Sequence, residues 1–248
     1  MSRRIESPAN PTVKSLARLL RRRHRNEEGR FLIEGRREVE RAVAAGIEIE
    51  MVLVCPELGG ATGAVDALDL SAAAFRKISV RQNPDGIIAV AATYPLDLDG
   101  VTSAELVLVT EAMEKPGNIG AMLRTVDATG AALAMADPVV DPFNPNVIRA
   151  SQGSVFAVPV AGAPAEAVRA RIGGTHHIVI AAPEAEETLW EADLSGPTAF
   201  VIGAERTGVS DVWRGLDRVT IPMSGSADSL NASVAAAVLL YEAVRRRG

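Results

Sequence analysis

A polar segment with a regular apolar stripe occupies residues 114–130 and reads EKPGNIGAMLRTVDATG. Pro116-Gly117 is typical of a turn, and Asn118 is a favourable cap for a helix that follows. The stripe has i, i+3, i+4, i+7 spacing and consists of Ile119, Met122, Leu123 and Val126. At roughly 100° per residue, Arg124 lies about 150° from its centre. Arg124 is therefore either a solvent-exposed charge or a group over the carboxyl edge of a sheet, where α/β proteins bind ligands.

A second segment, FVIGAERTGVSDVW at residues 200–213, places glycines after an apolar strand. Glycine lets a ligand approach the backbone closely, which makes Gly203 a candidate binding residue. The glycine spacing resembles a phosphate-binding loop, but Val209 stands where the lysine would be, and this disfavours a nucleoside triphosphatase. Glu205 is either a surface charge or a residue that orders the site. Ser210 is a candidate cap for a following helix.

The third segment, VTIPMSGSADSLNASVAAAVLLYEAVRRR, runs from residue 219 to residue 247. A strand ends at Ile221, and a loop of small residues leads to a long helix over 230–247. Ser229 and Asn231 favour the start of a helix, and capping alone would explain them. The helix is apolar on nearly all sides, so we expect it to be buried against the sheet, a second subunit or both. The face predicted to be buried consists of Val234, Ala237, Val238 and Tyr241.

Several kinds of chemistry lack the residues they need. The histidines form no H-E-x-x-H motif and offer little to a catalytic triad; they are His24, His176 and His177. No G-x-G-x-x-G opens a helix, so a dinucleotide-binding fold is not indicated. The single cysteine, Cys55, excludes an intramolecular disulfide and a cysteine-cluster zinc site. We therefore expect no metal.

Strands and helices alternate along the chain, which predicts an α/β fold. The N-terminal part shows a strand over 31–35, a helix over 37–46, a strand over 50–56 and a similar alternation to about residue 94. Strands are then predicted over 105–112, 132–137, 177–181, 199–203 and 219–222, and helices over 118–130, 147–154 and 230–247. Continuous apolar strands separated by helices favour a parallel sheet covered on both faces. A polar stretch with Pro and Gly at 94–103 indicates a boundary near residue 97, giving domains at 1–97 and 98–248.

The first 25 residues are strongly basic. They contain eight Lys or Arg and one acid, a net charge of +7, whereas the whole chain of 248 residues carries −5. Leu16, Leu19 and Leu20 recur at helical spacing, so Ser15–Arg25 is predicted to be a short helix with an apolar stripe. A basic arm on an acidic body suggests contact with a polyanion, although a solvated helix face would look the same.

Composition excludes several classes of protein. The hydrophobic fraction of 48% and charged fraction of 23% are ordinary for a globular chain and exclude a disordered one. No apolar run approaches the roughly 18 residues of a membrane span. The N-terminus turns polar where a signal peptide would be apolar. We therefore expect a cytoplasmic protein with no membrane association.

Taken together and in this order, the three segments resemble a known family. PGNIGAMLRT, VIGAERTGVS and IPMSGSADSLNASVAAAVLLYEA are similar to the three motifs of the SpoU/TrmH branch of the SPOUT RNA methyltransferases. The resemblance covers roughly residues 105–247, and the third motif is close to diagnostic. FLIEG followed by REVERA resembles, more loosely, the small RNA-binding substrate domain that often precedes these enzymes, including those that act on ribosomal RNA.

The resemblance implies a fold, a cofactor and an assembly. The fold is a parallel α/β sheet whose C-terminal segment forms a trefoil knot, preceded here by a smaller α/β RNA-binding domain. The members are homodimers that bind S-adenosylmethionine in the knot and usually methylate a ribose 2′-hydroxyl of RNA. Matching by residue places the cofactor pocket at Gly203, Ile221 and Leu230.

The same matching assigns the catalytic arginine to Arg124. The supporting polar residues are Asn118, Glu205, Ser229 and Asn231. A guanidinium has a pKa above about 12, so we expect Arg124 to donate hydrogen bonds to the developing alkoxide and the adjacent phosphate rather than to act as a simple base. In the basic arm, the predicted RNA contacts are Arg21, Arg22, Arg23 and Arg25.

Two positions depart from the family pattern. Arg206 follows the glutamate of the second motif, where many relatives have glycine. Gln152 stands in the segment RASQG where some relatives have an additional arginine, and either that RNA contact is missing or Arg149 replaces it. Two other functions stay open at this point: methylation of transfer RNA by the same fold, and a non-catalytic RNA-binding module of ribosome assembly.

Overall fold

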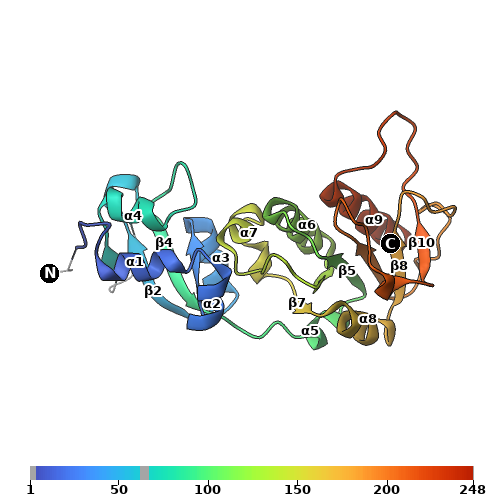
Figure 1. Ribbon diagram of the computed structural model, residues 1–248, viewed down its shortest axis with the longest axis horizontal. Helices are drawn as coiled ribbons and strands as arrows, with labels where there is room; N and C mark the ends of the chain where they lie inside the picture. The colour runs from blue at the N-terminus through green and yellow to red at the C-terminus, as the bar shows by residue number, and fades with distance from the viewer. Residues whose placement is uncertain (1–3, 62–66, 248) are drawn as a thin grey trace. The chain divides into compact units, whose positions relative to one another are not determined.

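The computed structural model describes residues 4–61 and 67–247, which form two compact units (Figure 1). The N-terminal unit comprises the residues up to Pro95 together with Asp141–Ala157. The C-terminal unit comprises Leu96–Val140 together with the residues from Val158 onward. No pattern in the sequence predicts that residues 141–157 fold with the N-terminal unit. The division into domains at residue 97 stays a prediction.

The N-terminal unit is built on a four-stranded mixed sheet with the order β1-β4-β2-β3. Strand β4 pairs antiparallel with β1 and β2, and β2 pairs parallel with β3. Its elements along the chain are α1 (Pro11–Arg18), α2 (Arg22–Glu28), β1 (Arg30–Glu34), α3 (Arg36–Ala44), β2 (Ile49–Val54), η1 (Pro56–Leu58), β3 (Ala67–Asp69), α4 (Ala72–Ile78), β4 (Ile87–Ala92), α7 (Pro145–Ala150) and η2 (Ser154–Phe156). Helix α1 packs against α4, and α7 packs against β1.

The predicted helix over Ser15–Arg25 is wrong, because the arm forms two helices. Helix α1 ends at Arg18, and α2 begins at Arg22. Leu19, in the break between them, is fully buried, and its carbonyl oxygen accepts a hydrogen bond of 2.9 Å from Nη1 of Arg25. The apolar stripe itself is confirmed at Leu16, which is buried too. The break is accompanied by this contact between Arg25 and Leu19, which helical periodicity does not reveal.

The C-terminal unit is a six-stranded, all-parallel sheet with the order β10-β8-β9-β5-β6-β7. Its elements are α5 (Leu98–Thr102), β5 (Leu106–Glu111), α6 (Pro116–Thr129), β6 (Ala132–Ala136), β7 (Val160–Ala163), α8 (Ala165–Gly173), β8 (His177–Ala181), β9 (Thr198–Ile202), η3 (Asp211–Trp213), β10 (Asp217–Val219) and α9 (Ala232–Arg247). The predicted α/β class is confirmed. The knot of this sheet stays a prediction.

The predicted face of α9 does not pack against the sheet. The buried residues are Ala232, Ala236, Leu239, Leu240, Glu242 and Ala243, and the helix packs on α6, β5 and β9. By contrast, Val234 is 48% exposed and Tyr241 is 53% exposed. Periodicity cannot choose a face on a helix that is apolar on nearly all sides. Within the described part of the chain, no helix has the length and apolar character needed to cross a membrane.

Arg25 forms a buried ion pair inside the N-terminal unit. Its exposed fraction is 1%, and its Nε donates to Oδ1 of Asp141 at 3.2 Å while Nη2 donates to Oδ2. Asp141 is 7% exposed. Arginine is almost never fully buried without a partner, so this pair attaches residues 141–157 to the arm. The role predicted for Arg25 as an RNA contact is therefore corrected, since its guanidinium is enclosed by protein.

We expect Arg25→Ala to lower the free energy of unfolding by about 3–5 kcal/mol, because it leaves the buried carboxylate of Asp141 without this partner. Urea denaturation measures the change. The matched control is Arg23→Ala: Arg23 pairs with Glu27 one helical turn away on the exposed surface, and an exposed pair contributes little to stability. Equal, small decreases for the two variants would contradict a structural role for the buried pair.

Candidate active site

A cavity of about 610 Å³ opens where the strands of the C-terminal unit end. Parallel strands present their carboxyl ends at one edge, and loops after β8, β9 and β10 meet there together with the start of α9. All three predicted cofactor residues, Gly203, Ile221 and Leu230, line the cavity, as do Glu205 and Ser229. The second and third sequence motifs thus share one pocket.

A chain of polar side chains joins the first motif to the other two. Glu205 accepts a hydrogen bond from Nδ2 of Asn118 at 2.8 Å on Oε1, and its Oε2 contacts Nζ of Lys115. Oδ1 of Asn118 in turn faces Nδ2 of Asn231 at 3.4 Å. Asn118 therefore bridges a carboxylate from the second motif and an amide from the third.

The expectation that Asn118 caps α6 is wrong. The cap is Lys115, and Pro116 occupies the first helical position, so Asn118 lies inside the first turn. Its side chain is consequently available for Glu205 and Asn231. Asn231 caps the start of α9, because its Oδ1 accepts from the backbone N–H and the hydroxyl of Ser233 at 3.0 and 2.7 Å, and its amide also donates to Asn118.

Lys115 belongs to this cluster, although it is not among the residues predicted from the sequence. Its ammonium, followed by the amide of Asn118, lowers the pKa of Glu205 below the ordinary value for a glutamate. Glu205 is therefore ionised near neutral pH and can only accept hydrogen bonds. The available signal for Lys115 was its position directly before the Pro-Gly turn that starts α6. Only the fold shows that it contacts Glu205.

Arg124 and Ser229 take no part in the hydrogen bonds of this cluster. Arg124 is exposed on α6, six positions after Asn118, and within residues 4–61 and 67–247 it has no hydrogen-bond or ion-pair partner. Its position off the apolar stripe is confirmed. Ser229 is exposed and lines the cavity. Both side chains are accessible to a substrate.

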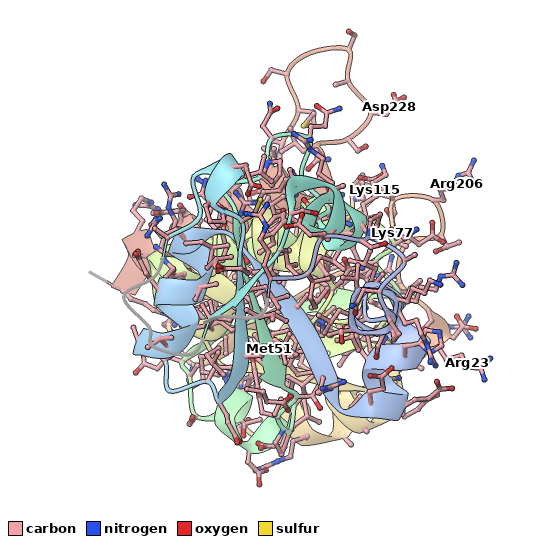
Figure 2. The ribbon with its side chains drawn as sticks, turned by 90° about the vertical axis from the view of Figure 1, so that its left-hand side faces the viewer. Arg23, Met51, Lys77, Lys115, Arg206 and Asp228 are labelled. Atoms are coloured by element: carbon pink, nitrogen blue, oxygen red, sulfur yellow. The ribbon has the colours of Figure 1, made fainter. Side chains whose placement is uncertain are left out.

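Gly203 is required by its own loop. A Cβ at this position would lie 2.1 Å from the carbonyl carbon and oxygen of Gly208, because the loop folds back in a bridge between Ala204 and Gly208. Figure 2 shows the side chain of Arg206 extending outward from this loop. The side chain of Arg206 is thus directed away from the loop's backbone.

A buried carboxylate anchors the far end of the same loop. Glu111, the last residue of β5, is 3% exposed and accepts hydrogen bonds from the backbone N–H of Ser210 at 2.8 Å and from its hydroxyl at 2.6 Å. Ser210 also caps η3 as predicted. Nothing in the sequence distinguishes Glu111 from a surface acid, since its partner lies 99 residues away.

The remaining predicted RNA contacts lie in the N-terminal unit. Arg21, Arg22 and Arg23 are exposed, in contrast to Arg25. Nε of Arg23 donates to Glu27 at 2.6 Å, and Figure 2 shows the Arg23 side chain directed into solvent. Nε of Arg22 lies 4.0 Å from Asp141. These three guanidinium groups remain accessible to a phosphate.

Two family models match this chain. Residues 105–241 match the SpoU rRNA Methylase family, and residues 10–89 match the MRM3-like substrate binding domain. The chain is 31% identical to the 23S rRNA (guanosine(2553)-2′-O)-methyltransferase RlmP of Bacillus subtilis, over 96% of this chain and 98% of that protein.

Two solved structures agree over nearly the full length. An RNA 2′-O ribose methyltransferase superposes with a TM-score of 0.85 at 45% identity, covering 98% of this chain and 99% of that one. The SpoU methyltransferase AviRb of Streptomyces viridochromogenes, in complex with the cofactor AdoMet, superposes with a TM-score of 0.84 at 30% identity, covering 96% and 98%. The chain belongs to the SpoU rRNA methylase family, as the three sequence motifs indicated.

We expect Lys115→Met to raise the pKa of Glu205 toward the ordinary glutamate value, because the ammonium is the main cause of its depression. Carboxyl-carbon NMR during an acid titration measures the shift. Lys77→Met is the control, since Lys77 is an exposed lysine of the N-terminal unit. An unchanged Glu205 titration in Lys115→Met would show that the ammonium does not set the charge of the site.

Proposed function

We propose that this protein transfers a methyl group from S-adenosylmethionine to a ribose 2′-hydroxyl of ribosomal RNA. The observation that carries the proposal is the meeting of the three motifs: a cavity lined by the second and third, adjoined by the hydrogen-bonded Glu205–Asn118–Asn231 chain. Family membership supports the reaction, and RlmP and AviRb support the substrate class and the cofactor.

The cavity suits the cofactor in size and character. Its volume falls within the roughly 300–1,000 Å³ of small-molecule sites. The lining combines glycine and alanine positions, which leave the backbone accessible, with apolar residues for a nucleoside and the acidic residue Asp228 for a cationic group. Gly203, Ile221 and Leu230 are the residues we propose to hold it.

When bound, S-adenosylmethionine supplies an electrophilic methyl group. Arg124 acts on the other reactant: its planar guanidinium donates to the oxygen that develops negative charge and to the neighbouring phosphate. The guanidinium stays charged throughout, so its contribution is electrostatic. Ser229 orients the ribose, and the Asn118 bridge fixes the second-motif loop beside it.

Ribosomal RNA is favoured over transfer RNA because RlmP, which the chain matches over nearly its full length, is a 23S rRNA methyltransferase. A non-catalytic RNA-binding module is the second candidate, and it is an outcome of the experiment below. Since ribosomal RNA is the proposed substrate, we also place the protein in the cytoplasm.

We further propose a homodimer formed through α9. Val234 and Tyr241 lie two turns apart on this helix and are about half exposed, and Val244, 38% exposed, continues the same face. Exposed apolar side chains grouped in this way are typical of interaction surfaces. An isologous pair, in which the same face meets its copy, is the commonest arrangement.

Arg124→Ala should reduce methyl transfer by about 100–1,000-fold, the usual decrease when one donor to a developing oxyanion is removed. Fold and cofactor affinity should remain, because Arg124 contacts no other described residue through a polar group. Labelled methyl transfer to ribosomal and transfer RNA, with calorimetric binding of S-adenosylmethionine, provides both readouts. Arg124→Lys should restore little activity, since one ammonium cannot replace a two-pronged donor.

The matched control is Arg171→Ala, an exposed arginine of the same unit that pairs with Asp99. It should retain full activity. Cofactor binding without transfer to any RNA by the wild type would favour the non-catalytic module. Loss of cofactor binding in Arg124→Ala would assign Arg124 to the pocket instead.

Tyr241→Glu should convert the dimer to a monomer, because it places a charge at the centre of the proposed apolar interface. Sedimentation at micromolar concentration measures the change in mass. Val43→Glu is the control, since Val43 is 59% exposed in the N-terminal unit. A wild-type protein that sediments as a monomer would contradict the proposed interface.

A further inference from the structure

Residues 141–157 lie within the SpoU-family match but fold as part of the N-terminal unit. Phe143 and Phe156 pack their rings against Phe31 of β1, with centroids 4.8 and 6.2 Å apart, and Tyr94 meets Phe143 edge-on at 5.0 Å. The unit that contains the substrate-binding domain therefore includes a segment from the family's catalytic region.

Helix α3 is fitted closely to one turn of this segment, residues 149–154. Nη1 of Arg37 donates to Oε1 of Gln152 at 2.7 Å, and Nη1 of Arg41 donates to Oγ of Ser154 at 3.0 Å. Between them, Gly153 has a φ of 83°, and a Cβ there would lie 2.9 Å from Cδ of Arg41. A larger residue would separate the helix from the turn.

Two arginines, one on α3 and one at the start of the 149–154 turn, carry charge that no acid among the described residues balances. Arg37 and Arg149 are exposed, and their polar partners are neutral amide oxygens, Gln152 for Arg37 and Asn146, at 3.5 Å, for Arg149. Among the described residues neither forms an ion pair, not even Arg37 with Glu40 on the same helix.

Two other arginines of the unit are paired with acids. Arg30 lies 3.0 Å from a carboxylate oxygen of Glu28, and Arg81 lies 2.8 Å from one of Glu38. On a chain with a net charge of −5, arginines positioned by amides rather than neutralised by acids mark a place for an external anion.

We propose that α3 and the 149–154 turn together form a phosphate-contacting surface for the RNA substrate, with Arg37 and Arg149 as its binding residues. This inference rests on the proposed function and extends it. Arg37 uses one Nη for Gln152 and keeps its remaining N–H groups for a phosphate, whose geometry a guanidinium matches. Gln152 stands where the family pattern suggested an arginine. Because Arg37 contacts Gln152, a guanidinium of the substrate-binding domain lies at this position instead.

The test uses the full-length chain and protein-free 23S rRNA, with affinity measured across a series of KCl concentrations. Arg37→Gln combined with Arg149→Gln should weaken binding and reduce the slope of log affinity against log salt by about 0.7–0.9 for each phosphate that is no longer neutralised. Arg37→Lys combined with Arg149→Lys keeps both charges and should keep the slope. S-adenosylmethionine binding, by calorimetry, should be unchanged in both.

The matched control replaces Arg171 and Arg214 by Gln, two exposed arginines of the C-terminal unit that pair with Asp99 and Asp211. It should leave the salt slope unchanged. A wild-type slope in the double glutamine variant, while the wild type binds and methylates the RNA, would overturn this surface alone. Absence of both binding and methylation in the wild type would overturn the proposed function and this inference with it. If the double glutamine variant unfolds, the single variants Arg37→Gln and Arg149→Gln replace it, and a wild-type slope in both would overturn the surface.

Discussion

Every feature of the site depends on the fact that parallel strands end at a common edge. Strands β8, β9 and β10 are adjacent, so the loops that follow them converge although they are separated by tens of residues. Strand β5 is the neighbour of β9 and ends at the same edge with Glu111, which holds Ser210. The loop that carries Gly203 and Glu205 is thereby fixed from both sides.

The charged side chains of the site have two different roles. Glu205 is balanced by Lys115 and oriented by Asn118, which makes it an acceptor that holds the motifs together. Among the described residues, Arg124 is left without a polar partner on the same helix as Asn118. One helix thus contributes an amide that completes the internal network and a guanidinium that remains available for a substrate.

Much of this arrangement could be predicted from the sequence. The strand at 177–181 was predicted with its observed bounds, and the parallel α/β class followed from apolar strands separated by helices. The cavity residues followed from the family motifs. Strand β7 and helix α8 were missed because VAGAPAEAV has little apolar contrast.

The errors concern contacts between residues distant in sequence. Arg25 looked like its neighbours in a basic run, and only the position of Asp141, 116 residues later, makes it a buried partner. The face of α9 that packs against the sheet could not be chosen from the sequence, because the helix is apolar on nearly all sides. Glu111 carried no local signal, and the position of Lys115 before a Pro-Gly turn did not point to Glu205, since their partners lie 99 and 90 residues away.

The placement of residues 141–157 determines how the protein can be divided. Severing the chain near residue 97 would separate Phe143 and Phe156 from Phe31, and Asp141 from Arg25. Each fragment would expose aromatic side chains and leave a charged side chain without its partner. The substrate-binding part consequently cannot be separated at residue 97, and grafting it onto another methyltransferase would require residues 141–157 to be transferred with it. Substitutions in residues 141–157 and in the N-terminal residues that they contact therefore constrain one another.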